Sequence, residues 1–232
     1  MKIENATVLV TGANRGLGLV FTRELLARGA RKVYAGARDP ATINQAGVQA
    51  LQLDVTNPKD VAAAAALASD VTLVINNAGI AQAGGFLAPD SEEVTRRIFE
   101  TNFFAMLRMS KAFAPILKAN GGGGLLNVLS VVSWISGAMA AYSASKSAAW
   151  SLTNALRLEL APQKTQVLAL HMGFVDTDLA RGFDAPKSSA EEIVKRALDG
   201  LEAGLDEVLA DERSLQVKQG LTAARPIYLP QT

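Results

Sequence analysis

Short apolar runs alternate with longer amphipathic stretches along the whole chain. The short runs are rich in β-branched and aliphatic residues, as in strands buried on both faces, whereas the longer stretches repeat their apolar positions every three or four residues, as helices do. The pattern predicts strands at residues 6–11, 32–37, 48–53, 71–76, 125–130, 166–171 and 207–210. It predicts helices at residues 17–28, 58–69, 90–118, 141–160, 189–202 and 212–223.

Several of these helices carry start or stop signals. Gly29 follows the first helix, and Pro58 stands where the first turn of the second would begin. Asp90 is an expected cap for the long helix, and the four glycines at 121–124 follow its end. Ser189 opens a sequence, SAEE, that resembles a capping box.

Strand–helix alternation of this kind requires right-handed crossovers and a parallel sheet covered by helices. The sequence therefore predicts an α/β fold: a single-domain doubly wound parallel sheet (Rossmann fold) of about seven strands with helices on both faces. We expect residues 1–232 to form one domain, because no linker-like stretch divides them. In such folds ligands bind outside the carboxyl ends of the strands.

Composition narrows the possible functions. The 23 basic and 22 acidic residues leave a net charge of +1, which favours neither nucleic acid nor an anionic membrane as partner. The longest wholly apolar run, residues 61–68, is far shorter than the ~20 residues that span a bilayer, and we expect a cytoplasmic protein. With no cysteine and one histidine, the chain offers no disulfide, no thiolate nucleophile and no predicted metal site.

A glycine-rich turn follows the first predicted strand. It reads TGANRGLG and places glycines at Gly12, Gly16 and Gly18. Glycine permits positive φ and lets the backbone approach a pyrophosphate, while the next helix points its N-terminal amides at the phosphates. Three glycines also occur in ordinary turns, but the strand before and the helix after are the context that a dinucleotide site requires.

The TGxxxGxG spacing resembles that of the short-chain dehydrogenase/reductase family, and three further motifs support the resemblance. Residues 76–79 read NNAG after the fourth strand, and residues 142–146 read YSASK, which matches the family's YxxxK. Asn102 stands in the long helix where the family has its active-site asparagine. The resemblance covers residues 6–180.

The resemblance implies that Tyr142 exchanges a proton with the substrate oxygen and that Lys146 holds the nicotinamide ribose. Lys146 lies one helical turn from Tyr142, and a cation there is expected to lower the tyrosine pKa. Ser130 would bind the same substrate oxygen. Its interval to Tyr142 is one residue shorter than usual, which leaves Ser133 as a less favoured alternative. Asn102 would bind a backbone carbonyl and a water that connects Lys146 to solvent, or would be only a polar residue at a local helix kink.

The residues near the adenosine ribose favour NADP(H) over NAD(H). NAD-preferring members have an acidic residue at the end of the second strand, where this chain has Gly36 and Ala37. Arg38 follows directly, and Arg15 lies in the glycine-rich turn. Two guanidinium groups suit a 2′-phosphate. Asp39 comes one position too late for the acidic role.

The resemblance assigns further cofactor contacts. Asp54 would contact the adenine, although a helix cap is an equally good interpretation, and the loop HMGFVDT would bind the nicotinamide amide with Met172 in place of the family's proline. His171 is interpreted as a packed structural residue rather than a catalytic one. The predicted cofactor-binding residues are Gly12, Asn14, Arg15, Gly16, Leu17, Gly18, Arg38, Asp54, Val55, Asn77, Ala78, Gly79, Tyr142, Lys146, Gly173, Val175 and Thr177.

Three functions follow from the resemblance. The favoured one is an NADPH-dependent reductase of ketones or aldehydes, acting reversibly as an alcohol dehydrogenase, with a short substrate lid at residues 178–189. The candidates for an apolar pocket are Leu179, Phe183, Trp134, Phe174 and Met139. The second function is a β-ketoacyl-carrier-protein reductase, for which Arg96, Arg97, Arg108 and Lys111 are the candidate docking residues. The third is a non-catalytic NADP(H)-binding regulator.

The helices at 90–118 and 141–160 carry more apolar residues than one sheet-facing stripe of about 100° requires. Relatives pair these helices between subunits, and the surplus therefore predicts a homodimer or homotetramer. The alternative is that the surplus packs within one chain.

Overall fold

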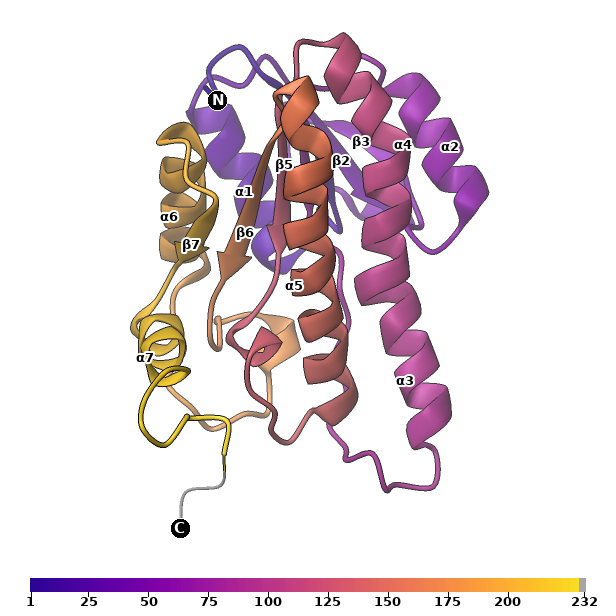
Figure 1. Cartoon of the computed structure of the whole chain (residues 1–232). Coiled ribbons are helices and arrows are strands. Elements are labelled where there is room, and N and C mark those ends of the chain that lie inside the picture. Colours follow the sequence, from indigo (N-terminus) through magenta and orange to yellow (C-terminus); the bar gives the residue numbers. More distant parts are fainter. Residues whose placement is uncertain (230–232) are drawn as a thin grey trace.

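A seven-stranded parallel sheet forms the centre of the computed structural model, which describes residues 1–229 (Figure 1). Its strands are β1 (Thr7–Thr11), β2 (Lys32–Ala37), β3 (Gln49–Gln52), β4 (Leu73–Asn76), β5 (Gly124–Val128), β6 (Gln166–His171) and β7 (Glu207–Leu209). The spatial order is β3-β2-β1-β4-β5-β6-β7, and every neighbouring pair is parallel. The chain reverses direction across the sheet between β1 and β4, which is where a doubly wound fold opens a ligand crevice. The predicted fold class is confirmed.

Helices cover both faces of the sheet. They are α1 (Gly16–Ala27), α2 (Pro58–Leu67), α3 (Ser91–Phe99), α4 (Ala105–Ala119), α5 (Ala140–Leu160), α6 (Ala190–Glu202) and α7 (Glu212–Gly220). Helices α1 and α6 pack together on one face, and α2, α4 and α5 lie side by side on the other (Figure 1).

Alternation along the strands divides the core between the two faces. Val8 and Val10 point towards α1 and α6, where they join Phe21 of α1, while Leu9 between them points to the other face and joins Phe113 of α4. All five side chains are fully buried. Burying one aliphatic or aromatic side chain contributes about 1.5–3 kcal/mol, so the continuous apolar strands are what hold the two helical layers to the sheet.

The predicted long helix at 90–118 contains an interruption that its periodicity did not show. A π-helical turn at Glu100–Phe104 lies between α3 and α4, and the helix ends at Ala119. A π turn inserts one extra residue and changes which side chains face inward. Asn102 is buried there, while Phe104 is 45% exposed. Asp90 precedes α3 as expected but makes no side-chain cap hydrogen bond.

Most predicted element ends lie within two or three residues of those observed. The difference that bears on the site is at β5, which was expected to extend to Ser130 and ends at Val128. Ser130 instead caps a short 3₁₀ turn at Val131–Ser133. Pro58 occupies the first turn of α2, and Ser189 caps α6 by accepting a hydrogen bond from the Glu192 amide, both as predicted.

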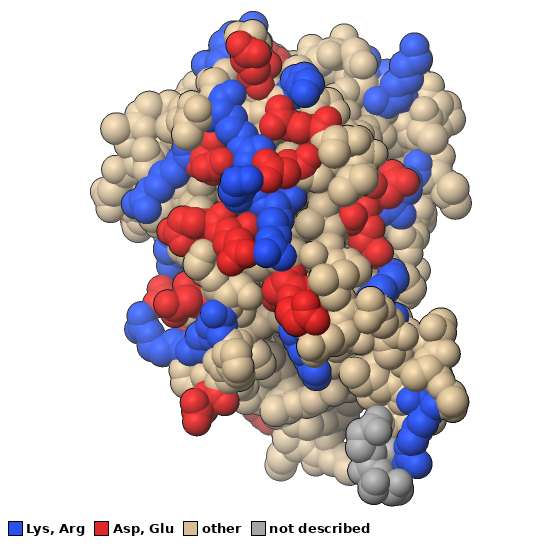
Figure 2. Space-filling model, turned by 90° about the vertical axis from the view of Figure 1, so that its left-hand side faces the viewer, with Lys and Arg blue, Asp and Glu red and all other residues tan. Residues whose placement is uncertain are grey.

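The charged side chains are intermixed rather than gathered by sign. On the face shown in Figure 2, basic and acidic groups lie next to one another. At the contact between α1 and α6, Arg28 forms ion pairs with Glu24, Asp199 and Glu202. Within residues 1–229 no helix is long and apolar enough to cross a membrane, and no cluster of acidic or histidine side chains is arranged to hold a metal ion.

Candidate active site

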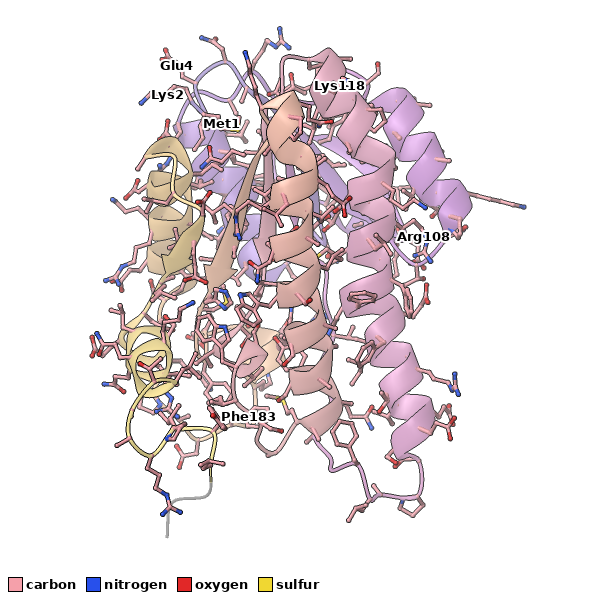
Figure 3. The ribbon with its side chains drawn as sticks, in the orientation of Figure 1. Met1, Lys2, Glu4, Arg108, Lys118 and Phe183 are labelled. Atoms are coloured by element: carbon pink, nitrogen blue, oxygen red, sulfur yellow. The ribbon has the colours of Figure 1, made fainter. Side chains whose placement is uncertain are left out.

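The predicted motif residues meet at the carboxyl ends of the strands, at the lower end of the molecule in Figure 1. The turns that follow β1, β4, β5 and β6 supply most of them, since these strands are neighbours in the sheet. Figure 3 places Phe183 of the lid at this end and Met1 at the opposite end. The site is therefore assembled by topology from segments far apart in the sequence.

The turn after β1 requires glycine at specific positions. Gly12 and Gly16 have φ values of 63° and 55°, which L side chains rarely adopt. At Gly18, the first turn of α1, an added Cβ would lie 2.1 Å from the carbonyl oxygen of Gly12. Leu17 is half-buried against the core, and Asn14 lies at the tip of the turn. These constraints leave an open backbone cradle at the N-terminus of α1.

Thr11 connects this cradle to the NNAG segment, and sequence analysis did not single it out. Its hydroxyl oxygen accepts hydrogen bonds from the amides of Asn77 and Ala78, both at 3.0 Å. The Asn77 side chain donates to the carbonyl oxygens of Thr11 (2.8 Å) and Gly12 (3.2 Å). Asn77 and Ala78 thus hold the turn after β1 and the NNAG segment in a fixed relation. The threonine that precedes Gly12 in the TG pair is the sequence feature that could have identified Thr11 as part of the site.

Asn102 holds the chain just beyond the NNAG segment. Its Oδ1 accepts from the Ile80 amide and its Nδ2 donates to the Ile80 carbonyl oxygen, both at 2.9 Å. Nδ2 also donates to Oγ of Ser145 at 2.9 Å, a contact that sequence analysis missed. A Cβ at Gly79 would lie 3.3 Å from Asn102 Oδ1 and 3.8 Å from Lys146 Nζ, so Gly79 borders both groups. The π turn is what brings Asn102 to this position.

Tyr142, Lys146 and Ser130 lie together at the start of α5. Burial raises the pKa of Tyr142 to about 12, and a hydrogen-bonding interaction with the Ser130 side chain acts in the opposite direction. Nζ of Lys146 lies 5.7 Å from the Tyr142 ring centroid and donates to the Val128 carbonyl oxygen at 2.8 Å. Burial lowers the pKa of Lys146 to about 8. The expected lowering of the tyrosine pKa is therefore wrong for this structure, because desolvation by burial outweighs the hydrogen-bonding interaction with Ser130, which acts in the opposite direction.

The two candidate serines have different surroundings. Ser130 lies beside Tyr142, and its Oγ accepts from the Val132 amide at 3.3 Å. Ser133 is buried, and its Oγ has no hydrogen-bond partner among residues 1–229. Of the two hydroxyl groups, the structure brings Ser130 to the tyrosine.

The loop after β6 lies against the glycine-rich turn. A Cβ on Gly16 would be 3.7 Å from the Thr177 side chain, so the two segments are in contact. The Gly173 amide donates to Asp211 Oδ2 at 2.6 Å, which attaches the loop to the start of α7. Val175 is buried and forms a parallel bridge with Ser188 at the far end of the lid. Asp211 was not predicted, because it is distant in sequence from every motif.

The residues assigned to the adenosine half are more exposed. Arg15 forms an ion pair of 3.1 Å with Asp178, whereas the exposed Arg38 has no ion pair within the described part of the chain. Asp54 accepts from the amide and the hydroxyl of Thr56 at 2.9 and 2.7 Å. Asn57 caps α2 instead, so the helix-cap interpretation of Asp54 is wrong. Val55, whose carbonyl oxygen accepts from Arg108, is buried next to it.

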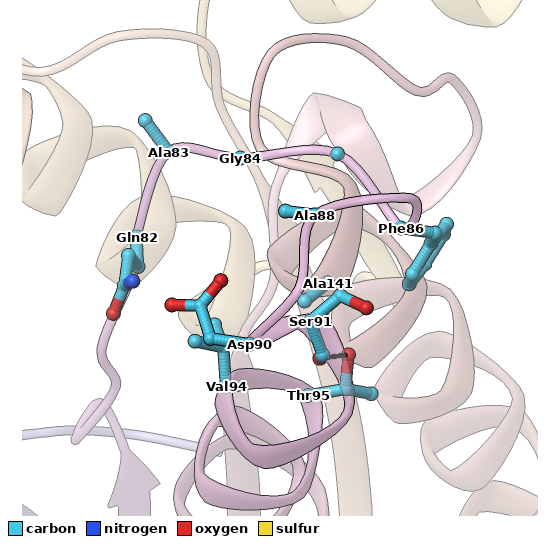
Figure 4. Close-up of a pocket in the computed structure, with 11 residues that line it drawn as sticks. Gln82, Ala83, Gly84, Phe86, Ala88, Asp90, Ser91, Val94, Thr95 and Ala141 are labelled. Carbon is cyan, nitrogen blue, oxygen red and sulfur yellow. Dashed lines mark hydrogen bonds between the residues drawn. The ribbon is translucent and has the colours of Figure 1, made fainter.

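The expected apolar pocket is only partly assembled. Phe174 and Phe183 stack with ring centroids 5.2 Å apart. Trp134 stacks instead on His171, which is fully buried, in agreement with its interpretation as a packed residue. Beside the site, the loop after β4 and the start of α3 line a small hollow that is partly open to solvent (Figure 4). Ala141, the neighbour of Tyr142, forms part of its wall.

Comparisons with known proteins agree with this geometry. The short chain dehydrogenase family model matches residues 6–188. A 3-oxoacyl-acyl-carrier-protein reductase from Vibrio cholerae is 30% identical over 200 residues, which cover 82% of each chain. A short chain dehydrogenase from Burkholderia cenocepacia, solved in complex with NADP, is 42% identical, with a TM-score of 0.93 over 97% of this chain and 96% of that one. A short-chain dehydrogenase from Sphingobium yanoikuyae, solved with NADPH, is 29% identical, with a TM-score of 0.80 over 98% of both chains.

The family model covers most of the chain, and it includes the glycine-rich turn, the NNAG segment, Tyr142 and Lys146. The sheet order and the grouping of these residues at the carboxyl ends of the strands agree with that match. The chain belongs to the short-chain dehydrogenase/reductase family of oxidoreductases.

Proposed function

We propose that this chain is an NADP(H)-dependent oxidoreductase that reduces a ketone or aldehyde to an alcohol and catalyses the reverse oxidation. The observation that carries the proposal is the grouping of Ser130, Tyr142 and Lys146 beside the glycine cradle. A phenol with a pKa of about 12 is fully protonated at neutral pH, so Tyr142 is a proton donor in the direction of reduction.

In this proposal the nicotinamide supplies a hydride to the carbonyl carbon when the cofactor is bound. The Tyr142 hydroxyl gives its proton to the carbonyl oxygen as the C=O bond becomes a C–O single bond, and Ser130 Oγ donates a hydrogen bond to the same oxygen. The reaction leaves a tyrosinate, which the Lys146 ammonium stabilises by its charge. Asn102 holds the neighbouring backbone, and a remaining lone pair of its Oδ1 is available for a water that returns the proton.

The residues present fit an NADP(H) cofactor. The cradle formed by Gly12, Gly16 and Gly18 admits no side chain at Gly18 and leads into the N-terminus of α1, where the first amides of a helix suit a pyrophosphate. Arg15 and Arg38 are the basic groups that would hold a 2′-phosphate. The Burkholderia cenocepacia and Sphingobium yanoikuyae relatives were solved with NADP and NADPH, which supports the same choice here.

Oxidation of NADPH and of NADH, followed by absorbance with a panel of aryl ketones, keto esters and aldehydes, tests the proposal. We expect turnover with NADPH on at least one class and much weaker turnover with NADH. Tight NADPH binding without turnover of any compound would favour a non-catalytic NADP(H)-binding regulator.

A β-ketoacyl-carrier-protein reductase is the second candidate, favoured by the Vibrio cholerae relative. The expected docking residues are mostly engaged within the chain: Arg96 pairs with Glu92, Arg97 contacts Gln82, and Arg108 pairs with Glu100. Comparison of a β-ketoacyl group on acyl carrier protein with the same group on a small thiol distinguishes the two candidates. A rate advantage of more than tenfold for the protein-bound substrate would favour the second.

We further propose that two copies of the chain pair through α4 and α5. The resulting assembly is a homodimer, or a homotetramer built from two such pairs. Ile98, Met106, Met109 and Phe113 are buried within one chain and account for part of the apolar surplus. Phe104 and Leu158 are 45% and 79% exposed, and a two-fold contact would cover them. Light scattering at micromolar concentration tests this, with Leu158→Glu as the disrupting variant. A particle of one chain's mass would contradict it.

A further inference from the structure

The only histidine of the sequence is the last residue of β6, and it is completely buried. Its chain neighbours Leu170 and Met172 are buried apolar residues. Burying an imidazole costs free energy unless its polar atoms are hydrogen-bonded, and an apolar side chain would fill the same space without that cost. The hydrogen bond that His171 makes is therefore the feature that an apolar residue could not supply.

That hydrogen bond goes to the backbone of Ser130. Nδ1 of His171 lies 3.0 Å from the Ser130 carbonyl oxygen. Because a carbonyl oxygen only accepts, Nδ1 carries the proton in this contact. Burial lowers the pKa of His171 to about 4, although the hydrogen bond to Ser130 raises it, so the ring is neutral at ordinary pH. Nε2 then has no proton and no hydrogen-bond partner among residues 1–229, although it lies 3.5 Å from Glu207 Oε1.

The end of β6 holds the peptide group between Ser130 and Val131 from both sides. His171 donates to the carbonyl oxygen, and the Val131 amide donates to the Met172 carbonyl oxygen at 2.8 Å. The Ser133 amide also donates to the Ser130 carbonyl oxygen, at 3.0 Å. Rotation of this peptide would move Cα of Ser130 and with it Oγ, which interacts with Tyr142 and donates to the Met172 carbonyl oxygen at 3.4 Å.

The imidazole is itself held by an aromatic and charged cluster. Trp134 stacks on it with a centroid distance of 4.0 Å and an interplanar angle of 21°. Nζ of Lys218 in α7 lies 4.6 Å from the Trp134 ring centroid and 2.9 Å from Glu207 Oε2. The ring of His171 thus has little freedom to turn, and its Nδ1 keeps its direction.

We propose that His171 is a positioning residue for Ser130, which orients the serine hydroxyl towards Tyr142 by holding the Ser130 carbonyl group. The inference rests on the proposed function in one respect, the assignment of Ser130 as a contact of the substrate oxygen. The hydrogen bond itself is tested independently of any turnover.

Two features of the sequence make a direct NMR test possible. With one histidine, ¹⁵N-histidine labelling gives the signals of a single imidazole, and Ser130–Val131 is the only Ser–Val pair in the chain. Labelling serine at the carbonyl carbon with ¹³C and valine with ¹⁵N therefore yields one amide correlation across that peptide. We expect a proton on Nδ1 and none on Nε2 in the unmodified protein. A proton on Nε2 with a bare Nδ1 would overturn the proposal without any variant.

Two substitutions separate the hydrogen bond from the shape of the ring. His171→Phe keeps a stacked ring and removes the donor, whereas His171→Asn places an amide nitrogen near the position of Nδ1. The Ser130–Val131 signal should move in His171→Phe and return towards its original position in His171→Asn. An unmoved signal in a folded His171→Phe protein would also overturn the proposal.

Steady-state kinetics then show whether the hydrogen bond of His171 affects turnover through Ser130. We expect His171→Phe to lower kcat about tenfold or more, with NADPH affinity unchanged, and His171→Asn to recover most of the loss. In a Ser130→Ala background His171→Phe should cause no further loss, whereas an equal loss in both backgrounds would show a role independent of Ser130. If the unmodified protein reduces no carbonyl compound, the proposed function fails, while the NMR signals still decide the role of His171.

Discussion

Arg15 and Asp178 form an ion pair of 3.1 Å that joins the glycine-rich turn after β1 to the lid after β6. Arg15 is also one of the two arginines assigned to the 2′-phosphate. The other, Arg38, follows β2, on the opposite side of β1 from the lid. The Arg15 guanidinium therefore has a carboxylate partner, Asp178, on the side of the lid, and its proposed phosphate partner would lie on the side of Arg38.

Removal of the Asp178 carboxylate should leave Arg15 free to bind the 2′-phosphate of NADPH. We expect Asp178→Asn to strengthen NADPH binding at most about fivefold, because an exposed ion pair contributes about 0.2–1 kcal/mol, and to leave NADH binding unchanged. Fluorescence titration with both cofactors measures this. Asp184→Asn in the same lid is the matched control, and equal gains for NADPH and NADH would contradict the competition.

Arg38 should contribute more than Arg15 to the preference for NADPH over NADH, because Arg38 has no ion-pair partner within residues 1–229. Loss of a charge-assisted contact costs about 1.5–3 kcal/mol, so Arg38→Ala should weaken NADPH binding about tenfold or more and leave NADH nearly unchanged. Lys59→Ala, at an exposed position of α2, serves as the control. Equal weakening of both cofactors would assign Arg38 to the fold or to the adenosine moiety instead.

The sequence predicted the sheet, its helices and most of the grouped residues, because apolar periodicity reports burial and the motifs stand directly at strand ends. The π turn at Glu100–Phe104 was not predictable in the same way. The turn places Asn102 against Ile80 and Ser145, contacts that exist only once tertiary structure brings these segments together. Asp211 was missed for the same reason, since its contact with Gly173 spans distant segments.

The pKa shifts in the site could not be predicted from the sequence either. Spacing alone places Lys146 one turn after Tyr142 and suggests a lowered tyrosine pKa. The depth of burial decides the sign, and both groups are nearly inaccessible: Tyr142 is 8% and Lys146 4% exposed. Desolvation disfavours the charged form of each, so the tyrosine pKa rises and the lysine pKa falls.

Tyr142→Phe tests the proton donor. The substitution removes one hydroxyl and keeps the ring, so we expect turnover to be abolished while the NADPH dissociation constant stays within about twofold, since proton transfer typically contributes about 10²–10⁴ in rate. Steady-state reduction and fluorescence titration give the two quantities. Tyr228→Phe, at an exposed tyrosine, should behave as the unmodified protein. A Tyr142→Phe protein that keeps more than a tenth of the activity would exclude this residue as the donor.

The pH dependence of reduction should follow Lys146. Its pKa is about 8, so above that pH the side chain becomes neutral and no longer stabilises the tyrosinate that forms. Tyr142, with a pKa of about 12, stays protonated throughout. At saturating NADPH and substrate, kcat should therefore be level below pH 8 and fall above it. Lys146→Met should be slow with no fall near pH 8, and a kcat that rises through pH 8 would contradict this account.

The two serines that follow β5 allow a matched comparison. The Ser130 side chain interacts with Tyr142, and Ser133 Oγ is buried without a hydrogen-bond partner in the described residues. Loss of a donor to the substrate oxygen costs about 10²–10³ in kcat, so Ser130→Ala should cause a loss of that order. Ser133→Ala removes a buried hydroxyl that makes no hydrogen bond, and we expect its kcat to remain within about twofold and its stability to be equal or higher. Parallel measurement of kcat and thermal midpoint decides the assignment. A large loss in Ser133→Ala with an active Ser130→Ala would transfer the role to Ser133.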